Sequence, residues 1–251
     1  MTDPEPPEDL QLPPSMELAW GLREVGARGP RRTLRLEQIV AAGIAVAEGE
    51  GVGALSMARI AKELGVGTMS LYRYVAAKDE LLTIMVDTAL GTPPPSAPGE
   101  DWRAGLTRWA VGVRTAYQRH LWSLRVPISA PPLGPNNVAW LDNALAALAG
   151  TPLDEQEKLS TVLLVSGFVR NDVTLTADFA AASGGEQVMP GYGELLGRLT
   201  SAEQFPSLHR AIESGSLDDP DNVDAEFNFG LERILDGVAA LIAGKPSRRR
   251  R

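Results

Sequence analysis

The segment from Ser56 to Lys78 constrains the fold of this chain more than any other. Ser56 precedes a short amphipathic run, residues 57–64, and a serine is favoured there because its hydroxyl accepts a hydrogen bond from a free N–H at the start of a helix. Gly65 follows, where a left-handed residue ends a helix. A second short helix is predicted over 68–75, and another begins at Lys78. Two short helices joined by a tight turn form a helix-turn-helix.

Apolar spacing supplies a core for this motif. Between Leu36 and Ala47 apolar residues recur every three to four positions, which predicts a preceding helix that ends at the glycines of residues 49–53. The seam between the two short helices is apolar and consists of Ile60, Ala61, Leu64, Val66, Leu71 and Val75. The sequence therefore predicts an N-terminal three-helix domain over residues 31–91.

Polar side chains line the second short helix, at Thr68, Ser70, Tyr72, Arg73 and Tyr74. A short helix with hydroxyls and an arginine on its outer face fits a major groove about 12 Å wide. Two interpretations follow from the residues alone: a DNA-reading helix, or a helical hairpin with a solvated polar face.

Local charge favours the first interpretation. The whole chain has a formal net charge of −8 and a pI near 4.9. Residues 28–78 nevertheless contain eight basic and only four acidic side chains, and a run of four arginines occupies residues 248–251. A nucleic acid would therefore meet a basic segment in an otherwise acidic protein.

Several classes of function are excluded or disfavoured by composition. The chain has no cysteine and two histidines, which excludes disulfides, thiolate metal sites and cysteine nucleophiles. No GxSxG, P-loop or HExxH motif is found, so we expect no enzyme activity, cofactor or metal. There is no apolar run of eighteen residues and no secretory leader, which indicates a cytoplasmic protein with no membrane partner.

Breaks in composition divide the chain. The proline-rich residues 1–30 are predicted to be disordered or weakly ordered, with a short helix at 18–25. The prolines of residues 92–98 separate the first domain from a larger one over 99–245, and a basic tail covers 246–251. In the larger domain helices are predicted at 101–117, 136–149, 154–182, 194–199, 202–213 and 224–243. No strand is predicted, and the fold class is all-α.

Residues 36–90 resemble the N-terminal domain of the TetR/AcrR family of transcriptional regulators. The resemblance is carried by Ser56, Ile60-Ala61, Leu64-Gly65-Val66, Leu71-Tyr72, Tyr74, Lys78 and Leu81-Leu82. It implies that Thr68, Met69, Ser70 and Arg73 face base edges, and that Ser56, Tyr72, Tyr74 and Lys78 hold phosphates. Two positions depart from the family pattern, because Arg35 replaces a hydroxyl cap and Gly67 replaces a polar residue.

Arg28, Arg31 and Arg32 precede the first predicted helix of this domain. Basic arms in this position enter an adjacent minor groove in other DNA-binding proteins. The alternative is a solvated charge run that contacts nothing.

The second domain resembles the regulatory domain of the tetracycline repressor type, which implies a four-helix dimer interface. Our candidate helices are 154–182 and 227–243, and the second has an apolar stripe. The stripe residues are Phe227, Leu231, Ile234, Leu235 and Val238. The alternative is that this stripe faces the core of its own subunit.

A ligand pocket needs apolar walls and a few polar groups. Aromatic residues gather in the second domain, and the candidate pocket residues are Trp109, Tyr117, His120, Trp140, Phe168 and Asn171. Core packing is the alternative for each aromatic residue. The sequence thus predicts a homodimeric, ligand-responsive regulator that binds a palindromic operator and is released by a small-molecule inducer. Repression is predicted rather than activation. The rival prediction is a helical ligand-binding or partner-binding protein that does not read DNA.

Overall fold

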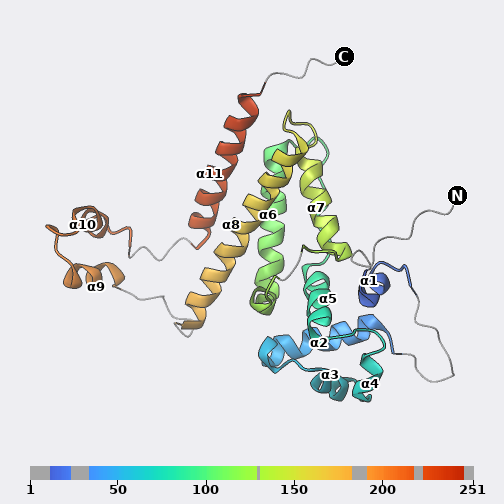
Figure 1. Cartoon of the computed structure of the whole chain (residues 1–251). Coiled ribbons are helices and arrows are strands. Elements are labelled where there is room, and N and C mark those ends of the chain that lie inside the picture. Colours follow the sequence, from blue (N-terminus) through green and yellow to red (C-terminus); the bar gives the residue numbers. More distant parts are fainter. Residues whose placement is uncertain (1–11, 24–33, 129–130, 183–190, 218–222, 246–251) are drawn as a thin grey trace, which may run out of the picture. The chain divides into compact units, whose positions relative to one another are not determined.

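The computed structural model describes residues 12–23, 34–128, 131–182, 191–217 and 223–245 (Figure 1). These residues form helices and no strand, in agreement with the predicted all-α class. The chain divides into two compact units. One contains the residues up to 151 together with 155–162, and the other contains 152–154 and the residues from 163 onward.

The first unit contains seven described α-helices and the beginning of an eighth. They are α1 (Pro14–Ala19), α2 (Leu36–Glu50), α3 (Met57–Leu64), α4 (Thr68–Leu71), α5 (Lys78–Leu90), α6 (Trp102–Arg119), α7 (Pro135–Leu148) and the first turns of α8 (Glu155–Ala182). Short 3-10 helices at Val52–Ala54 and Leu121–Arg125, which the sequence did not predict, join neighbouring helices.

The helices α2, α3, α4 and α5 share one core. Ile39, Ile60, Leu71 and Met85 are each essentially inaccessible to solvent. Burying a side chain of this size contributes about 1.5–3 kcal/mol, so four such residues anchor the domain. A methyl group on Gly43 would lie 2.6 Å from the sulfur of Met85, which shows how closely α2 and α5 approach.

The helix α1 is an ordered part of this unit. It begins four residues earlier than predicted, and its Ser15 and Met16 are buried. The Ser15 N–H and hydroxyl both donate to the Glu80 carboxylate of α5. The N-terminal extension was predicted to be weakly ordered, and over residues 12–23 that prediction is wrong because this buried contact ties the segment to the domain.

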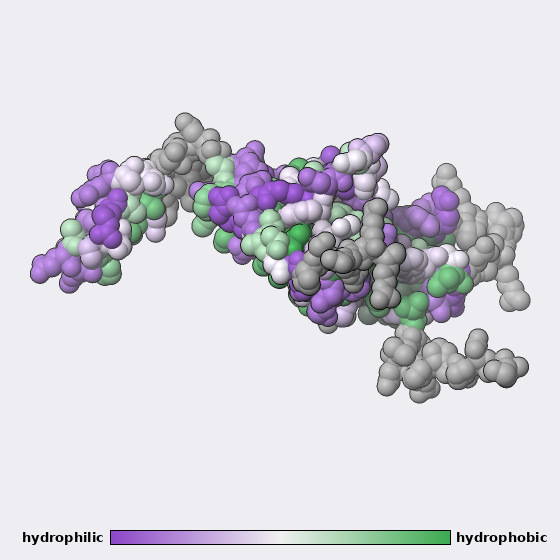
Figure 2. Space-filling view, turned by 90° about the horizontal axis from the view of Figure 1, so that it is seen from above, coloured by the Kyte–Doolittle hydropathy of each residue, from purple (hydrophilic) through white to green (hydrophobic). Residues whose placement is uncertain are grey.

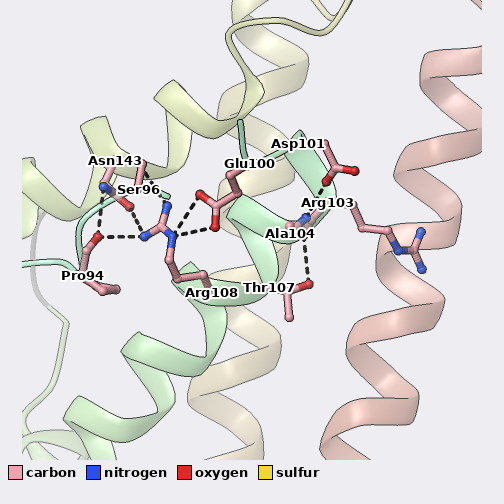
Figure 3. A network of polar contacts seen from close by, with 9 residues as sticks. All are labelled: Pro94, Ser96, Glu100, Asp101, Arg103, Ala104, Thr107, Arg108 and Asn143. Carbon is pink, nitrogen blue, oxygen red and sulfur yellow. Dashed lines mark hydrogen bonds and ion pairs between the residues drawn. The ribbon is translucent and has the colours of Figure 1, made fainter. Parts of the chain in front are cut away.

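The proline-rich segment does not separate the compact units, because α5 packs against α6 and α7 on its far side. Arg108 of α6 holds the segment in place, as Figure 3 shows. Its guanidinium donates to the Pro94 carbonyl at 2.7 Å, to the Glu100 carboxylate at 3.0 Å and to Asn143 of α7 at 3.2 Å. The predicted break at 92–98 is thus a linker that is pinned to the helices on its C-terminal side.

The second unit contains the remainder of α8, α9 (Tyr192–Leu199), α10 (Pro206–Glu213) and α11 (Val223–Ala243). Phe168 of α8 stacks on Phe227 of α11 with ring centroids 5.6 Å apart. Gly230 lies beneath the same ring, where a methyl group would be 2.5 Å from a Phe168 carbon. The helices α9 and α10 pack on each other, and Figure 2 shows both purple and green surface on this pair, as expected for amphipathic helices.

Candidate nucleic-acid interface and regulatory region

The helices α3 and α4 form the predicted helix-turn-helix. Ser56 caps α3, since its hydroxyl oxygen accepts from the Arg59 N–H at 3.1 Å. Gly65 has φ 65° and ψ 32°, the left-handed conformation that a residue without Cβ adopts without strain. The chain then enters α4 at Thr68. The local sequence therefore sets the angle between the two helices.

The helix α4 is shorter than predicted. It ends at Leu71, whose carbonyl accepts from the N–H groups of both Tyr74 and Val75. Shared bonds of this kind close a helix by tightening its last turn. Tyr72 to Val75 therefore form a turn that leads toward α5.

The outer side of α4 and the turn after it presents the residues predicted to face bases. Met69 is 77% exposed, Arg73 is exposed, and Thr68 and Ser70 are half-buried. On the opposite side Leu71 is fully buried and anchors the helix to the core. The fold thus brings the four predicted base-reading side chains onto one short segment, with the apolar side turned inward.

The residues predicted to hold phosphates are not alike in the structure. Ser56 and Tyr72 are exposed, and Lys78 is half-buried in the first turn of α5. Tyr74, in contrast, is 2% exposed, and its hydroxyl donates to the backbone carbonyl of Leu34. The hydroxyl of Tyr74 already bonds the segment before α2, so its phosphate contact stays a prediction that this structure disfavours.

Basic side chains near α3 are only partly available to a polyanion. Arg59 donates to Glu50 at 2.6 Å and to Glu63 at 2.7 Å. These hydrogen bonds raise the pKa of Arg59, and the bond from Arg59 lowers the pKa of Glu50. Arg59 is thus neutralised locally, whereas Arg73 and Lys78 have no acidic partner among the ion pairs of the described residues. The predicted arm residues Arg28, Arg31 and Arg32 lie outside the described residues, as does the arginine tail.

Comparison with known proteins decides the family. Residues 39–83 match the family of bacterial regulatory proteins of the tetR type, and residues 94–242 match the tetracyclin repressor-like C-terminal domain. The chain is 36% identical over 245 residues to the transcriptional repressor DrrR1 of Streptomyces coeruleorubidus, covering 91% of this chain and 86% of that protein. It belongs to the TetR family.

Other relatives agree. The transcriptional repressor Rv1353c of Mycobacterium tuberculosis is 28% identical over 239 residues, covering 90% of this chain and 87% of the repressor. The crystal structure of the TetR family protein ActR of Streptomyces coelicolor in complex with actinorhodin superimposes with a TM-score of 0.74 at 27% identity, covering 85% and 99% of the two chains. The protein is a DNA-binding transcriptional regulator, and the rival prediction of a protein that does not bind DNA is not favoured.

The predicted pocket residues of this TetR-family chain are divided between the two units. Trp109 and Trp140 are both 4% exposed, and their rings meet edge-on with centroids 6.0 Å apart. Their indole N–H groups donate to the carbonyls of Trp140 and Gly91, each at 2.8 Å. Both residues therefore serve the core, which was the alternative interpretation.

The other predicted pocket residues have varied surroundings. His120 approaches Glu48 of α2 at 2.8 Å, and Tyr117 is half-buried. Phe168 stacks on Phe227 in the second unit, where Asn171 is exposed. Neither unit by itself gathers the six residues around a cavity.

Two cavities among the described residues of the first unit bear on a ligand site. The larger, of about 410 Å³, lies between linker residues 96–102 and the C-terminal end of α7, and none of the predicted pocket residues lines it. The smaller, of about 20 Å³, is enclosed by α5, α6, Leu121–Arg125 and α7. Tyr117 lines the smaller cavity together with Asn137, which the sequence analysis missed.

The apolar stripe of α11 was predicted to form the dimer interface. Phe227, Leu231, Leu235 and Val238 are each at most 5% exposed within the single chain, and Ile234 is half-buried. The four buried residues already belong to the core of one subunit, so their role in a dimer interface stays a prediction that this burial disfavours.

Other apolar side chains of α8 and α11 are exposed. From residue 163 onward they are Leu163, Leu164, Leu175 and Phe179 on α8 and Phe229 and Leu241 on α11, with exposed fractions from 42% to 74%. The sequence analysis missed these residues because periodicity shows that a helix has an apolar stripe but not what the stripe packs against. In the described part of the chain, no helix is apolar over a length that would cross a bilayer.

Proposed function

We propose that this protein is a repressor that binds a palindromic operator as a homodimer and releases it when a small-molecule inducer binds. The observation that carries the proposal is the exposed outer side of α4, held by the buried Leu71 and by the left-handed turn at Gly65. A short rigid helix of this kind is what a major groove admits. The match of residues 39–83 to the tetR type supports this reading.

Within that interface, we assign base contacts to Thr68, Met69, Ser70 and Arg73. Arg73 is suited to the paired acceptors of guanine and Met69 to the methyl group of thymine. We assign phosphate contacts to Ser56, Tyr72 and Lys78, because a hydroxyl or an ammonium group holds a phosphate without reading sequence. We do not assign a phosphate contact to Tyr74. Its buried ring and its hydrogen bond to Leu34 instead support the segment that carries these contacts.

The dimer interface in this proposal is the exposed apolar side of α8 and α11. On α8 the positions of Leu164, Leu175 and Phe179 differ by eleven and four residues, which places them on one side of a helix. Contiguous apolar surface of this kind marks a protein interface. Two-fold pairing through α8 and α11 would repeat the same surface on both subunits.

The inducer is proposed to be a small organic molecule, because ActR was crystallised with actinorhodin. The small cavity lined by Tyr117 and Asn137 is the proposed start of its site, since it touches α5, α6 and α7 together. Actinorhodin is the first probe to test.

A DNA-selection experiment tests the proposal. Purified protein is mixed with fragments from the promoter region that flanks its own gene and with a random duplex library, and bound DNA is sequenced. We expect an inverted repeat whose half-sites lie about one turn, roughly 34–36 Å, apart. Recovery of no preferred sequence would refute the operator proposal.

Calorimetry then tests the release mechanism. An inducer that weakens operator affinity must bind the free protein more tightly than the operator-bound protein, and by the same factor. A 100-fold release corresponds to about 2.7 kcal/mol of coupling. Equal affinities of the probe in the two states would refute release by this route.

A further inference from the structure

The carboxylate of Asp87 lies near the C-terminal end of α5 and is 3% exposed. It accepts four hydrogen bonds from the first turn of α7. The backbone N–H groups of Asn136 and Asn137 donate at 3.2 and 2.8 Å, and their side-chain amides donate at 3.2 and 2.7 Å. Asp87 is therefore the buried acid that joins the helix leading from the DNA-binding residues to a helix of the regulatory domain.

The first turn of a helix has N–H groups with no partner in the helix and a partial positive charge. The α7 helix begins at Pro135, which has no N–H, and its N-cap residue Gly134 has no side chain to supply an acceptor. Asp87 provides from another helix the cap that α7 lacks. A carboxylate in this place is held by charge-assisted bonds, which are stronger than neutral ones.

The turn before α7 leaves no space around this carboxylate. A methyl group on Gly134 would lie 2.2 Å from the carboxyl carbon of Asp87. A second, independent contact reaches the same turn from the N-terminal extension, because the Trp20 indole N–H donates to the Leu133 carbonyl at 2.8 Å. The turn from Leu133 to Asn137 is thus held at two points by helices of the DNA-binding region.

We propose that Asp87 is the positioning residue that fixes α7 against α5, and through α5 sets the orientation of the DNA-reading segment relative to the regulatory helices. The inference rests on the proposed function, in which two subunits must present α4 at the spacing of successive major grooves. Without the Asp87 cap, the orientation of α5 relative to the regulatory helices would no longer be fixed. Each subunit would still read its half-site, but the pair would no longer favour one half-site spacing.

The direct test measures a distance within one chain and needs no DNA. The chain has no cysteine, so Ala41→Cys on α2 and Ala146→Cys on α7 place two spin labels at exposed positions. Labelled chains are diluted with unlabelled ones so that only pairs within a chain contribute. We expect a narrow distance distribution in the parent protein and a broader one after Asp87→Asn or Asp87→Ala. The matched control is Asp142→Asn, which removes the same charge from the exposed surface of α7 and should leave the distribution narrow.

The second measurement compares DNA ligands from the selection experiment. Asp87→Asn should retain the affinity for a single half-site. Its preference for an operator of the selected spacing, over an operator whose spacing is one base pair longer, should fall roughly tenfold. Gly134→Ala, which pushes a methyl group against the carboxylate, should act in the same direction. Thermal unfolding of each variant confirms that it is folded at the temperature of measurement.

A narrow distribution together with unchanged spacing preference in folded Asp87 variants would overturn the inference. Failure of the parent protein to select any DNA would instead refute the proposed function. The label distance would then still decide whether Asp87 positions α7 against α5.

Discussion

The surface around α4 and the exposed sides of α8 and α11 differ in what they require of a partner. Around α4 the exposed groups are mostly polar, with Met69 as the large apolar exception. On α8 and α11 leucines and phenylalanines are exposed at up to 74%. A polar surface is stable in water until DNA arrives, whereas a large apolar surface is unfavourable until another protein covers it. We infer that DNA reading belongs to each subunit, while the second surface belongs to the pair.

The two surfaces also differ in how they are supported. The α4 segment is fixed by local features, namely the Ser56 cap, the Gly65 turn and the buried Leu71. The α8 and α11 pair is fixed by contacts between residues far apart in sequence, such as Phe168 on Phe227. Damage to the second surface should therefore alter operator binding only through loss of pairing.

The largest effect is expected for Leu164→Glu on α8. Leu164 is 55% exposed in the single chain, so the change should hardly alter the stability of a subunit. In a closed apolar interface the same charge costs several kcal/mol. We expect monomers of unchanged melting temperature and a large loss of operator affinity. Sedimentation velocity and operator titration measure these outcomes.

Two controls separate pairing from folding. Ile128→Glu introduces the same charge at another exposed apolar residue, at 72%, and should leave the dimer intact. Leu235→Glu buries a charge inside one subunit and should unfold the protein rather than yield monomers. A stable dimer of Leu164→Glu would place the interface on another surface.

The next effect concerns base reading. Arg73→Ala and Thr68→Ala should each relax the preference at particular base pairs, by about 1–3 kcal/mol for a good contact. Affinities for a panel of single-base-pair operator variants measure this preference. Arg198→Ala removes an exposed arginine from α9 and is the control. A uniform loss over the whole panel would show that neither residue reads bases.

Local signals made much of the DNA-binding region predictable. The bounds of α3 and the start of α5 agree with the sequence analysis because a serine cap and a left-handed glycine define the ends of α3, and acids mark the first turn of α5. The base-reading side chains, whose role stays a prediction, were placed on an exposed segment because Leu71 must turn inward. These are short-range rules that a single sequence displays.

Features that depend on distant residues were not predictable. The sequence of the α11 stripe is the same whether the stripe covers a partner or the core of its own subunit. Only the contact of Phe227 with Phe168 in the structure distinguishes these two cases. The hydroxyl of Tyr74 bonds a carbonyl forty residues earlier in the chain. In the sequence Asp87 does not differ from the other acids of α5, because the groups that donate hydrogen bonds to it lie about fifty residues away. No periodicity or cap signal reports such pairs.

A smaller effect is expected for Tyr74→Phe. The change removes the hydrogen bond to Leu34 and keeps the buried ring, so it should lower the free energy of unfolding by about 1 kcal/mol. Urea titration measures the loss, and Tyr72→Phe, at an exposed tyrosine, is the control that should show none. The salt dependence of DNA binding should be the same as in the parent protein. A flatter salt dependence without a change in stability would return Tyr74 to the phosphate contacts.

The smallest effect is expected for Lys78→Ala. This change tests DNA contact near α4 without altering the pairing of subunits. Lys78 is half-buried in the first turn of α5 and has no acidic partner among the ion pairs of the described residues, so its charge is available to a phosphate. A phosphate contact carries no sequence information, so operator and random DNA should weaken alike. Because each neutralised phosphate releases counterions, the slope of log affinity against log salt should flatten by about one unit. The subunits should stay paired, since the change lies far from α8 and α11 in sequence and adds no charge there. An unchanged slope would remove Lys78 from the interface and leave Ser56 and Tyr72 as its only phosphate-holding candidates.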